Sequence, residues 1–474
     1  MTRFKAIFNS LRFNHPYITK FISLIKAKRG QFISLIKAKK GQWVRGFLIG
    51  LVISVCVFFL ATLGHFRLFE NSMFAILQQI NIRQSNDIAL LFITKKEYKQ
   101  GFNNTSPLSR ERLAKIIETL VKHHPKAIAV DIDLSDSGEG YDALKKSLRS
   151  AEDNHIPVIV PSILKPKIKI AAMAKDNERP TPYLSGIYEK NKNGYILYKG
   201  PTALDDELRV MSNVMHGGSV STKDRDGVFR HGAAFYHTGS GNDIEPSFPL
   251  SIAAASQGID QKLLEKSLKE KTWNGILREG SIKIKPGSSN KEIKIHYGKN
   301  GKFTPNFLGN YVYFPYDIDV DRLLKTNQSG TRPDARTIFR DKIVIVGGVY
   351  DHNDFYRTPV GKMSGMEVIA NMVQSILDHN MITHLNYLCA FIVEVLLGAL
   401  TALIFILMSP VVALLFCFVT LIPATILLSL KIFDASYYWI DFMPTIFGVM
   451  IHGIISKIEY NAHVADVILP EKGQ

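Results

Sequence analysis

The chain has little cysteine, and the positions of its cysteines restrict how its parts can be stabilised. Of its 474 residues only 3 are cysteine, and Cys56, Cys389 and Cys417 all lie in long apolar runs. The mixed-composition segment 66–384 has none, so an ordinary hydrophobic core must hold it together rather than a disulfide framework. This composition favours a bacterial periplasm over an animal cell surface.

The sequence also lacks the motifs of common catalytic sites. It has no P-loop, no G-x-S-x-G, no H-E-x-x-H and no cysteine or histidine spacing typical of a metal site. Hydrolase and zinc-enzyme hypotheses therefore have no support. We expect no enzymatic activity, no metal and no cofactor.

Acidic residues are missing from the N-terminal segment. The first acid is Glu70, whereas lysine and arginine are frequent in residues 1–46. Because this basic arm precedes an uncharged apolar run, the positive-inside rule places residues 1–46 in the cytoplasm and predicts an uncleaved transmembrane helix at 47–65. Much of the net charge of +16 thus lies beside a bilayer, and nucleic acid is not an expected partner.

The basic arm contains a tandem repeat of 11 residues, FISLIKAKRGQ from Phe21 and FISLIKAKKGQ from Phe32. Each copy joins an apolar patch to basic residues, as in a helix that lies on an anionic leaflet. A duplicated flexible tail is the alternative, because Gly30 and Gly41 would interrupt one long helix. Both interpretations stay open.

Three further apolar runs lie at residues 385–408, 411–430 and 438–455. We expect residues 385–456 to form three transmembrane helices and 457–474 to form a short cytoplasmic tail. With one crossing before segment 66–384 and three after it, both termini are cytoplasmic and the segment between them is not. The sequence therefore predicts a multi-pass protein of the bacterial inner membrane.

One acid, Glu394, interrupts the first of these late runs. A carboxylate inside a membrane span is costly and normally faces protein or water. We expect Glu394 to bond a hydroxyl on the next helix, such as Thr420 or Thr425, and so to join two helices. A proton path is the alternative.

Segment 66–384 alternates predicted strands and helices. Strands are expected at IALLFIT, AIAVDID, VIVPSI and KIVIVGG, and a helix is expected after Ser109. IKIKPGSSNKEIKIHYG is typical of a hairpin. Short crossovers imply a parallel arrangement. The predicted fold is an α/β sensor domain, with a mixed or parallel sheet and flanking helices, plus all-α transmembrane helices, one before and three after.

Several charged residues follow the predicted strands. Asp131 and Asp133 lie at the carboxyl end of one strand, where ligands of open α/β sheets bind, and Asp351 and Asp354 follow another. Arg230 could pair with an acidic ligand or with these aspartates. Each has a structural alternative, since an aspartate at a strand end can cap a turn and residues 351–354 can be a polar loop.

Five motifs occur in a familiar order: AIAVDIDLS, DRDGVFRHGAAFY, SFPLSIAAA, YFPYDIDVDRLL and DKIVIVGGVYDHNDFYRTPVGKMSGMEVIANMVQSIL. Together they resemble the CHASE domain family, type 2, which implies a sensory extracellular domain associated with cyclases and histidine kinases. The resemblance adds Thr358 and Glu367 of the last motif to the ligand-binding candidates. The chain departs from the family at Ile369, where a histidine is common, and at 457–474, where members usually continue into an output domain.

The leading hypothesis is a stand-alone sensor that binds a small ligand or an envelope protein and signals through a separate protein. A structural or assembly subunit of an envelope complex is the alternative, and a periplasmic enzyme is a third class. Expected partners are the lipid bilayer, a membrane or envelope protein and a second copy of the chain. Gly398 and Ala402, four residues apart, offer a close-packing face for such a partner.

Overall fold

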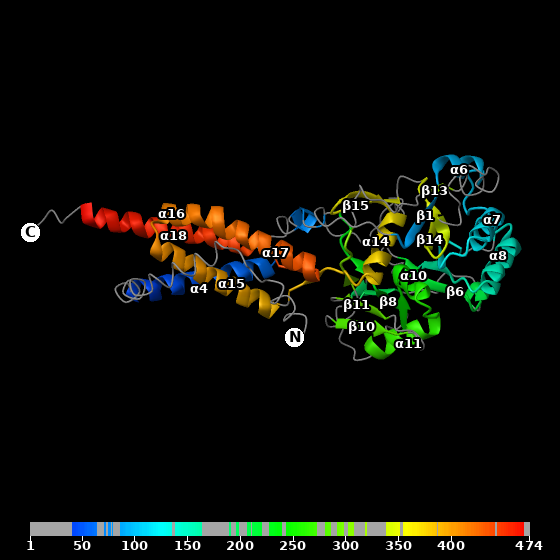
Figure 1. Cartoon of the computed structure of the whole chain (residues 1–474), viewed down its shortest axis with the longest axis horizontal. Helices are drawn as coiled ribbons and strands as arrows, with labels where there is room; N and C mark the ends of the chain where they lie inside the picture. The colour runs from blue at the N-terminus through cyan, green and yellow to red at the C-terminus, as the bar shows by residue number, and fades with distance from the viewer. Residues whose placement is uncertain are drawn as a thin grey trace, which may run out of the picture. The chain divides into compact units, whose positions relative to one another are not determined.

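The structure, a computed structural model, divides the chain into two compact units, residues 75–382 and residues 1–74 with 383–474 (Figure 1). It describes residues 40–63, 71–72, 74–76, 78, 86–134, 138–163, 189–190, 196–198, 206–209, 211–219, 227–238, 243–272, 280–285, 292–297, 302–307, 318–319, 338–350, 354–385, 387–440 and 443–468. The tandem repeat of the basic arm lies almost entirely outside these ranges, as does Asp351.

A six-stranded parallel sheet forms the centre of unit 75–382, with strand order β13-β1-β14-β2-β3-β6. Its strands are β1 (Ile88–Ile93), β2 (Ala127–Asp131), β3 (Val158–Ile163), β6 (Val214–Ser219), β13 (Ile318–Asp319) and β14 (Ile343–Gly348). Every pair of neighbours in this sheet is parallel. The predicted parallel sheet is confirmed.

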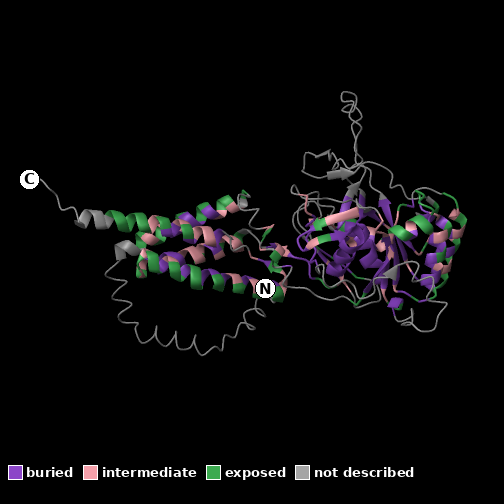
Figure 2. Ribbon diagram, turned by 90° about the horizontal axis from the view of Figure 1, so that it is seen from above, coloured by how far each residue is buried: buried purple, intermediate pink, exposed green. Residues whose placement is uncertain are grey.

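Helices cover both faces of the sheet. Alternate side chains point to opposite faces, so Leu90 joins the core beneath α10 (Phe248–Ser256) and α14 (Gly365–Leu377), whereas Leu91 joins the core beneath α7 (Arg110–Val121) and α8 (Tyr141–Asp153). Burial on both faces explains why these strands read as continuous apolar runs (Figure 2).

Local sequence sets where the flanking helices begin. Ser109 accepts a hydrogen bond from the N–H of Arg112 at the start of α7, as the sequence predicts, and Ser247 caps α10 in the same way. Ser364 and Glu367 form a reciprocal capping box at the start of α14. These caps stabilise the first turn of each helix.

Smaller elements complete the unit. A mixed sheet of order β4-β5-β8-β9 joins β4 (Glu189–Lys190), β5 (Ile196–Tyr198), β8 (Phe235–Thr238) and β9 (Asp243–Pro246). The predicted hairpin is confirmed as antiparallel β10 (Gly280–Ile284) and β11 (Ile293–Tyr297). Two further strand pairs are β7 (Gly232–Ala233) with β12 (Lys302–Phe303), and β15 (Phe355–Thr358) with β16 (Gly361–Ser364). The remaining helices are α6 (Lys95–Gln100), α9 (Asp206–Arg209) and α11 (Gln261–Thr272).

The other unit is a helix bundle made of α4 (Lys40–Thr62), α15 (Tyr387–Leu407), α16 (Pro410–Phe416) continuing through the π-helical turn Cys417–Leu421 into α17 (Ile422–Ser436), and α18 (Met443–Ile468). Three described helices are long and apolar enough to cross a membrane: Val44–Ala61, Leu388–Leu407 and Pro410–Ser436. The fourth predicted span, residues 438–455, corresponds to the helix α18, which is not one of these three. It begins at Met443 rather than 438, because Tyr438–Trp439 forms a short strand, β18, with β17 (Thr383–His384).

Contacts between side chains fix the directions of these helices. The ring centroids of Phe58 on α4 and Phe391 on α15 lie 5.2 Å apart, and Arg45 on α4 forms an ion pair of 2.8 Å with Glu459 on α18. The end of α4 therefore lies beside the start of α15, and the start of α4 lies beside the end of α18. The chain leaves the bundle after α4 and re-enters it with α15 at the same end.

The bundle corrects two predictions about its helices. Glu394 does bond a hydroxyl, but the donor is Thr445 on α18, 3.1 Å from Oε2, whereas Thr425 donates to the carbonyl of Leu421 on its own helix. Gly398 faces Gly50 of α4 within the chain, so it does not offer a free face to a partner.

Ala402, like Gly398, packs against α4 within the chain. It is 1% exposed, and a Cβ added at Gly50 would lie 3.0 Å from its own Cβ. Small residues at this contact let the backbones of α4 and α15 approach closely.

Candidate ligand site at the carboxyl ends of the sheet

The direction of chain crossovers changes at strand β14. The helix after β14, α14, covers one face of the sheet, whereas the helices after its neighbours β1 and β2, α7 and α8, cover the other. In open α/β sheets, ligands bind outside the carboxyl ends of strands where the connections change faces in this way. The topology therefore indicates a ligand site at the carboxyl ends of β2 and β14.

Asp131 lies at this position. It is the last residue of β2 and pairs in register with Gly347 of β14. A Cβ added at Gly347 would lie 2.8 Å from Sδ of Met366 and 3.2 Å from Cβ of Asp131. A side chain at residue 347 would therefore displace the side chain of Met366, which lies in the first turn of α14.

Asp354 approaches the same position from the segment that follows β14. Its carboxylate lies against Gly365, the first residue of α14, where an added Cβ would come within 2.5 Å of Oδ1 and 2.7 Å of Oδ2. The amino end of a helix carries partial positive charge from its free N–H groups, which favours a carboxylate at this end.

The two carboxyl groups influence each other. Burial, and to a lesser extent the negative charge of Asp354, raise the pKa of Asp131 from 3.8 to about 7. Its protonation therefore changes near neutral pH, and any positively charged group that reaches the pair would compete with that proton. The arrangement suits a proton or a cationic group.

The other predicted site residues that the structure describes make different contacts. Asp133 is exposed, and its carbonyl accepts a 3.0 Å hydrogen bond from the buried guanidinium of Arg110. Thr358 donates to the carbonyl of Gly361, 2.7 Å away, and closes the turn between β15 and β16.

Glu367 and Arg230 are buried near the amino end of α14 and beside β15, respectively. Oε2 of Glu367 accepts hydrogen bonds from N and Oγ of Ser364, at 2.7 and 2.8 Å, so it stabilises the helix start. Arg230 follows Phe229, whose N–H donates to the carbonyl of Arg357 at 2.7 Å. Glu367 thus stabilises the first turn of α14, and the backbone beside Arg230 is bonded to β15.

Sequence reasoning missed two kinds of contributor. Gly347 and Gly365 give the two aspartates their space, and Tyr98 stacks on Tyr350 with centroids 4.1 Å apart and an interplanar angle of 2°. The double glycine that ends KIVIVGG signals a close backbone approach after a strand. Nothing in the sequence links Tyr98 to Tyr350, because 251 intervening residues separate them.

The described residues contain no group of three or more histidine, cysteine, aspartate or glutamate side chains that could hold a metal ion.

Comparison with known proteins identifies the family. No curated protein and no solved structure matches the chain. The model of the CHASE2 domain matches residues 52–409, which include the whole α/β unit and reach into helices α4 and α15. CHASE2 is a family of sensory domains, and this chain belongs to the CHASE2 domain family.

Proposed function

We propose that this chain is a membrane-anchored sensor whose CHASE2 domain binds a proton or a cationic ligand at the pair Asp131 and Asp354. The supporting observation is that the Asp354 carboxylate lies on the first residue of α14. A change of charge there acts on a helix that ends at Leu377, after which the chain soon enters α15 at Tyr387.

The proposed switch has two states. With both carboxylates charged, repulsion between Asp131 and Asp354 favours an arrangement in which they separate; a bound proton or cation favours the close one. A ligand shifts such an equilibrium only through its different affinity for the two states. Gly365, the first residue of α14, contacts Asp354. The two states therefore differ in the position of α14, and the ligand binds more tightly to one of these positions.

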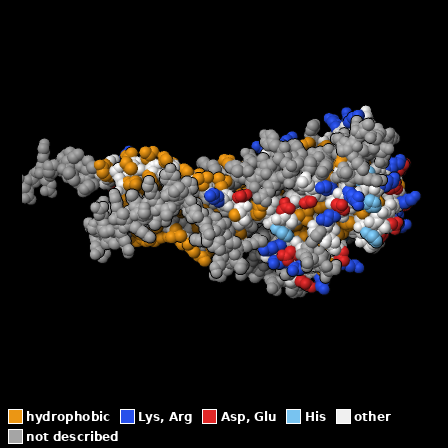
Figure 3. Space-filling model, viewed as in Figure 1, with side chains coloured by type: hydrophobic (Ala, Val, Ile, Leu, Met, Phe, Trp, Pro, Cys, Tyr) orange, Lys and Arg blue, Asp and Glu red, His pale blue; other side chains and the backbone are white. Residues whose placement is uncertain are grey.

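The bundle supports insertion in a membrane. Its buried side chains include the polar Ser54, Glu394 and Thr445, whereas large apolar side chains such as Leu396 and Val419 are 64% and 66% exposed. Figure 3 shows hydrophobic side chains on the outside of the helices and charged ones on the α/β unit. This inverted pattern fits lipid as the surrounding solvent.

We further propose that the CHASE2 domain is extracytoplasmic in the bacterial inner membrane and that both termini are cytoplasmic. The basic arm before α4 and the antiparallel contacts of α4 with α15 and α18 support this orientation. In a variant that lacks Cys56, Cys389 and Cys417, single cysteines at Ser212 and Asn461 test it. An impermeant thiol reagent added to intact spheroplasts should label residue 212 only; equal labelling would contradict the orientation.

We propose that a separate membrane protein receives the signal. A crosslinker on the lipid-facing side of the bundle tests whether the chain is a sensor or only a structural subunit. A photoreactive amino acid at Leu396 should form an adduct with another membrane protein in native membranes. If the chain is a sensor, Asp131→Asn changes the yield of that adduct, because it fixes the charge of the pair. A structural subunit predicts the same yield with and without the substitution.

A further inference from the structure

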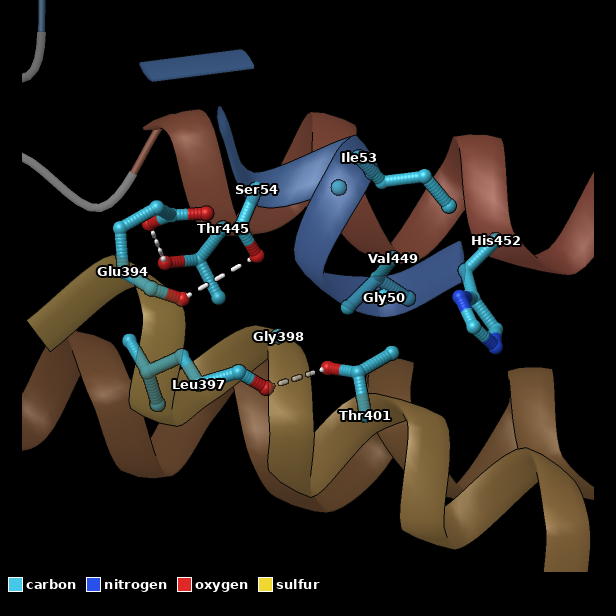
Figure 4. Close-up of a pocket in the computed structure, with 11 residues that line it drawn as sticks. Gly50, Ile53, Ser54, Glu394, Leu397, Gly398, Thr401, Thr445, Val449 and His452 are labelled. Atoms are coloured by element: carbon cyan, nitrogen blue, oxygen red, sulfur yellow. Dashed lines mark hydrogen bonds between the residues drawn. The ribbon is translucent and has the colours of Figure 1, made fainter. Parts of the chain in front are cut away.

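The helices α4, α15 and α18 enclose a small cavity of about 10 Å³ (Figure 4). Its polar lining consists of Ser54 from α4, Glu394 and Thr401 from α15, and Thr445 and His452 from α18. All five side chains are 5% exposed or less. A cavity of this size holds about one water-sized particle.

The hydroxyl groups of the lining offer lone pairs to this cavity rather than protons. Ser54 donates to the carbonyl of Glu394 at 3.4 Å, Thr401 donates to the carbonyl of Leu397 at 2.9 Å, and Thr445 donates to Oε2 of Glu394 at 3.1 Å. Each hydroxyl proton is therefore directed at a protein oxygen. What remains available on the hydroxyl oxygens is acceptor capacity.

The charged groups of the lining also favour a cation over an anion. It contains one carboxylate and one imidazole, and neither lysine nor arginine. A carboxylate away from water is costly unless a proton or a cation accompanies it. Glycines at 50, 398 and 448 keep the three helices close, so no large group fits between them.

We propose that this cavity binds one small monovalent cation, Na⁺, with Glu394 as the anionic ligand and the hydroxyls of Ser54 and Thr445 as neutral ligands. The two titratable groups that line it are Glu394 and His452. The site is separate from the aspartate pair of the CHASE2 domain. It lies where α4, which precedes that domain, meets α15 and α18, which follow it.

The test uses the full chain in lipid nanodiscs. Dicyclohexylcarbodiimide reacts with protonated carboxyl groups in apolar surroundings, so the rate at which Glu394 is modified, read by mass spectrometry, reports its occupancy. If Na⁺ is the ligand, replacing K⁺ by Na⁺ slows modification at fixed pH by fivefold or more. A rate that falls as the pH rises but does not respond to Na⁺ would show only that the carboxyl group of Glu394 ionises, and it would overturn the proposal.

Variants separate ligand binding from folding. Thr445→Val removes one neutral ligand and should raise the concentration of Na⁺ needed for the half-maximal effect by about tenfold. Thr425→Val is the matched control, because its hydroxyl bonds Leu421 and does not line the cavity. A modification rate that responds to neither Na⁺ nor pH, or no modification of Glu394 at any pH, would overturn the proposal.

Discussion

The carboxylate of Asp354 lies so close to Gly365 that a methyl group at residue 365 would come within 2.5 Å of Oδ1. Gly365→Ala therefore has to displace Asp354 or the first turn of α14. We expect a loss of about 1–3 kcal/mol in the free energy of unfolding, as for other overpacked sites. Chemical denaturation of the full chain in detergent would measure it.

Gly138→Ala is the matched control for that substitution. The nearest atom to its added Cβ would be Cγ of Pro107 at 3.7 Å, which is ordinary van der Waals contact. Stability should stay within about 0.5 kcal/mol of the wild type. Equal losses in both variants would show that the contact between Asp354 and residue 365 is not responsible.

Protonation of Asp131 should make the chain more stable in mild acid. Its pKa is raised from 3.8 to about 7 in the folded state, so the folded chain holds a proton that the unfolded chain has released between these values. This contribution is fully present below about pH 4 and is lost as the pH rises to about 7. At about 1.4 kcal/mol per pKa unit it amounts to a few kcal/mol at most.

Asp131→Asn tests this linkage. The amide cannot ionise, so the variant should lose the fall in stability between about pH 4 and 7 and should be more stable than the wild type at pH 8. Asp133→Asn, whose side chain is exposed, serves as the control and should follow the wild-type profile. A wild-type profile for Asp131→Asn would mean that this carboxyl group does not carry the proton.

The capping box at α14 gives a third prediction. Ser364→Ala removes the hydroxyl that accepts from the N–H of Glu367 and donates to its carboxylate, so it should cost about 1 kcal/mol. Thr94→Ala removes the hydroxyl that accepts from the N–H of Glu97 at the start of the short helix α6 and provides a comparison. Hydrogen exchange should report faster opening of α14 in the first variant only.

Gly398→Leu gives a fourth prediction, about the bundle. A side chain at residue 398 would collide with Oγ of Ser54 and with the backbone of Gly50 on α4. The variant should lose the packing of α4 on α15 and become sensitive to detergent at a lower temperature. Leu396→Ala, at a residue that is 64% exposed, should leave the bundle intact.

The parallel sheet and its helices could be predicted from the sequence because their signals are local. IALLFI, AIAVD and IVIVGG are strands buried on both faces, and Ser109, Ser247 and Ser364 cap the helices that follow. The insertion of β14 between β1 and β2 could not be predicted this way, because it depends on pairing between residues far apart in the chain.

The candidate site was predicted in part. Asp131 ends one strand and Asp354 follows another, which the sequence shows, but the proximity of the two strand ends depends on the register between Asp131 and Gly347. The hydrogen-bond partner of Glu394 was predicted on the wrong helix for a related reason. Thr445 and Thr425 are both threonines on later helices, and only the packing of α18 against α15 decides between them.

The central claim is that the charge of the aspartate pair is transmitted through α14 to the bundle, and hydrogen exchange of the full chain in nanodiscs tests it most directly. Asp131→Asn with Asp354→Asn mimics the neutralised pair without any knowledge of the ligand. We predict altered exchange in α14 and also in the first turns of α15, from Tyr387, relative to the wild type at the same pH. Changes confined to residues 349–367, with α15 unaltered, would contradict the account.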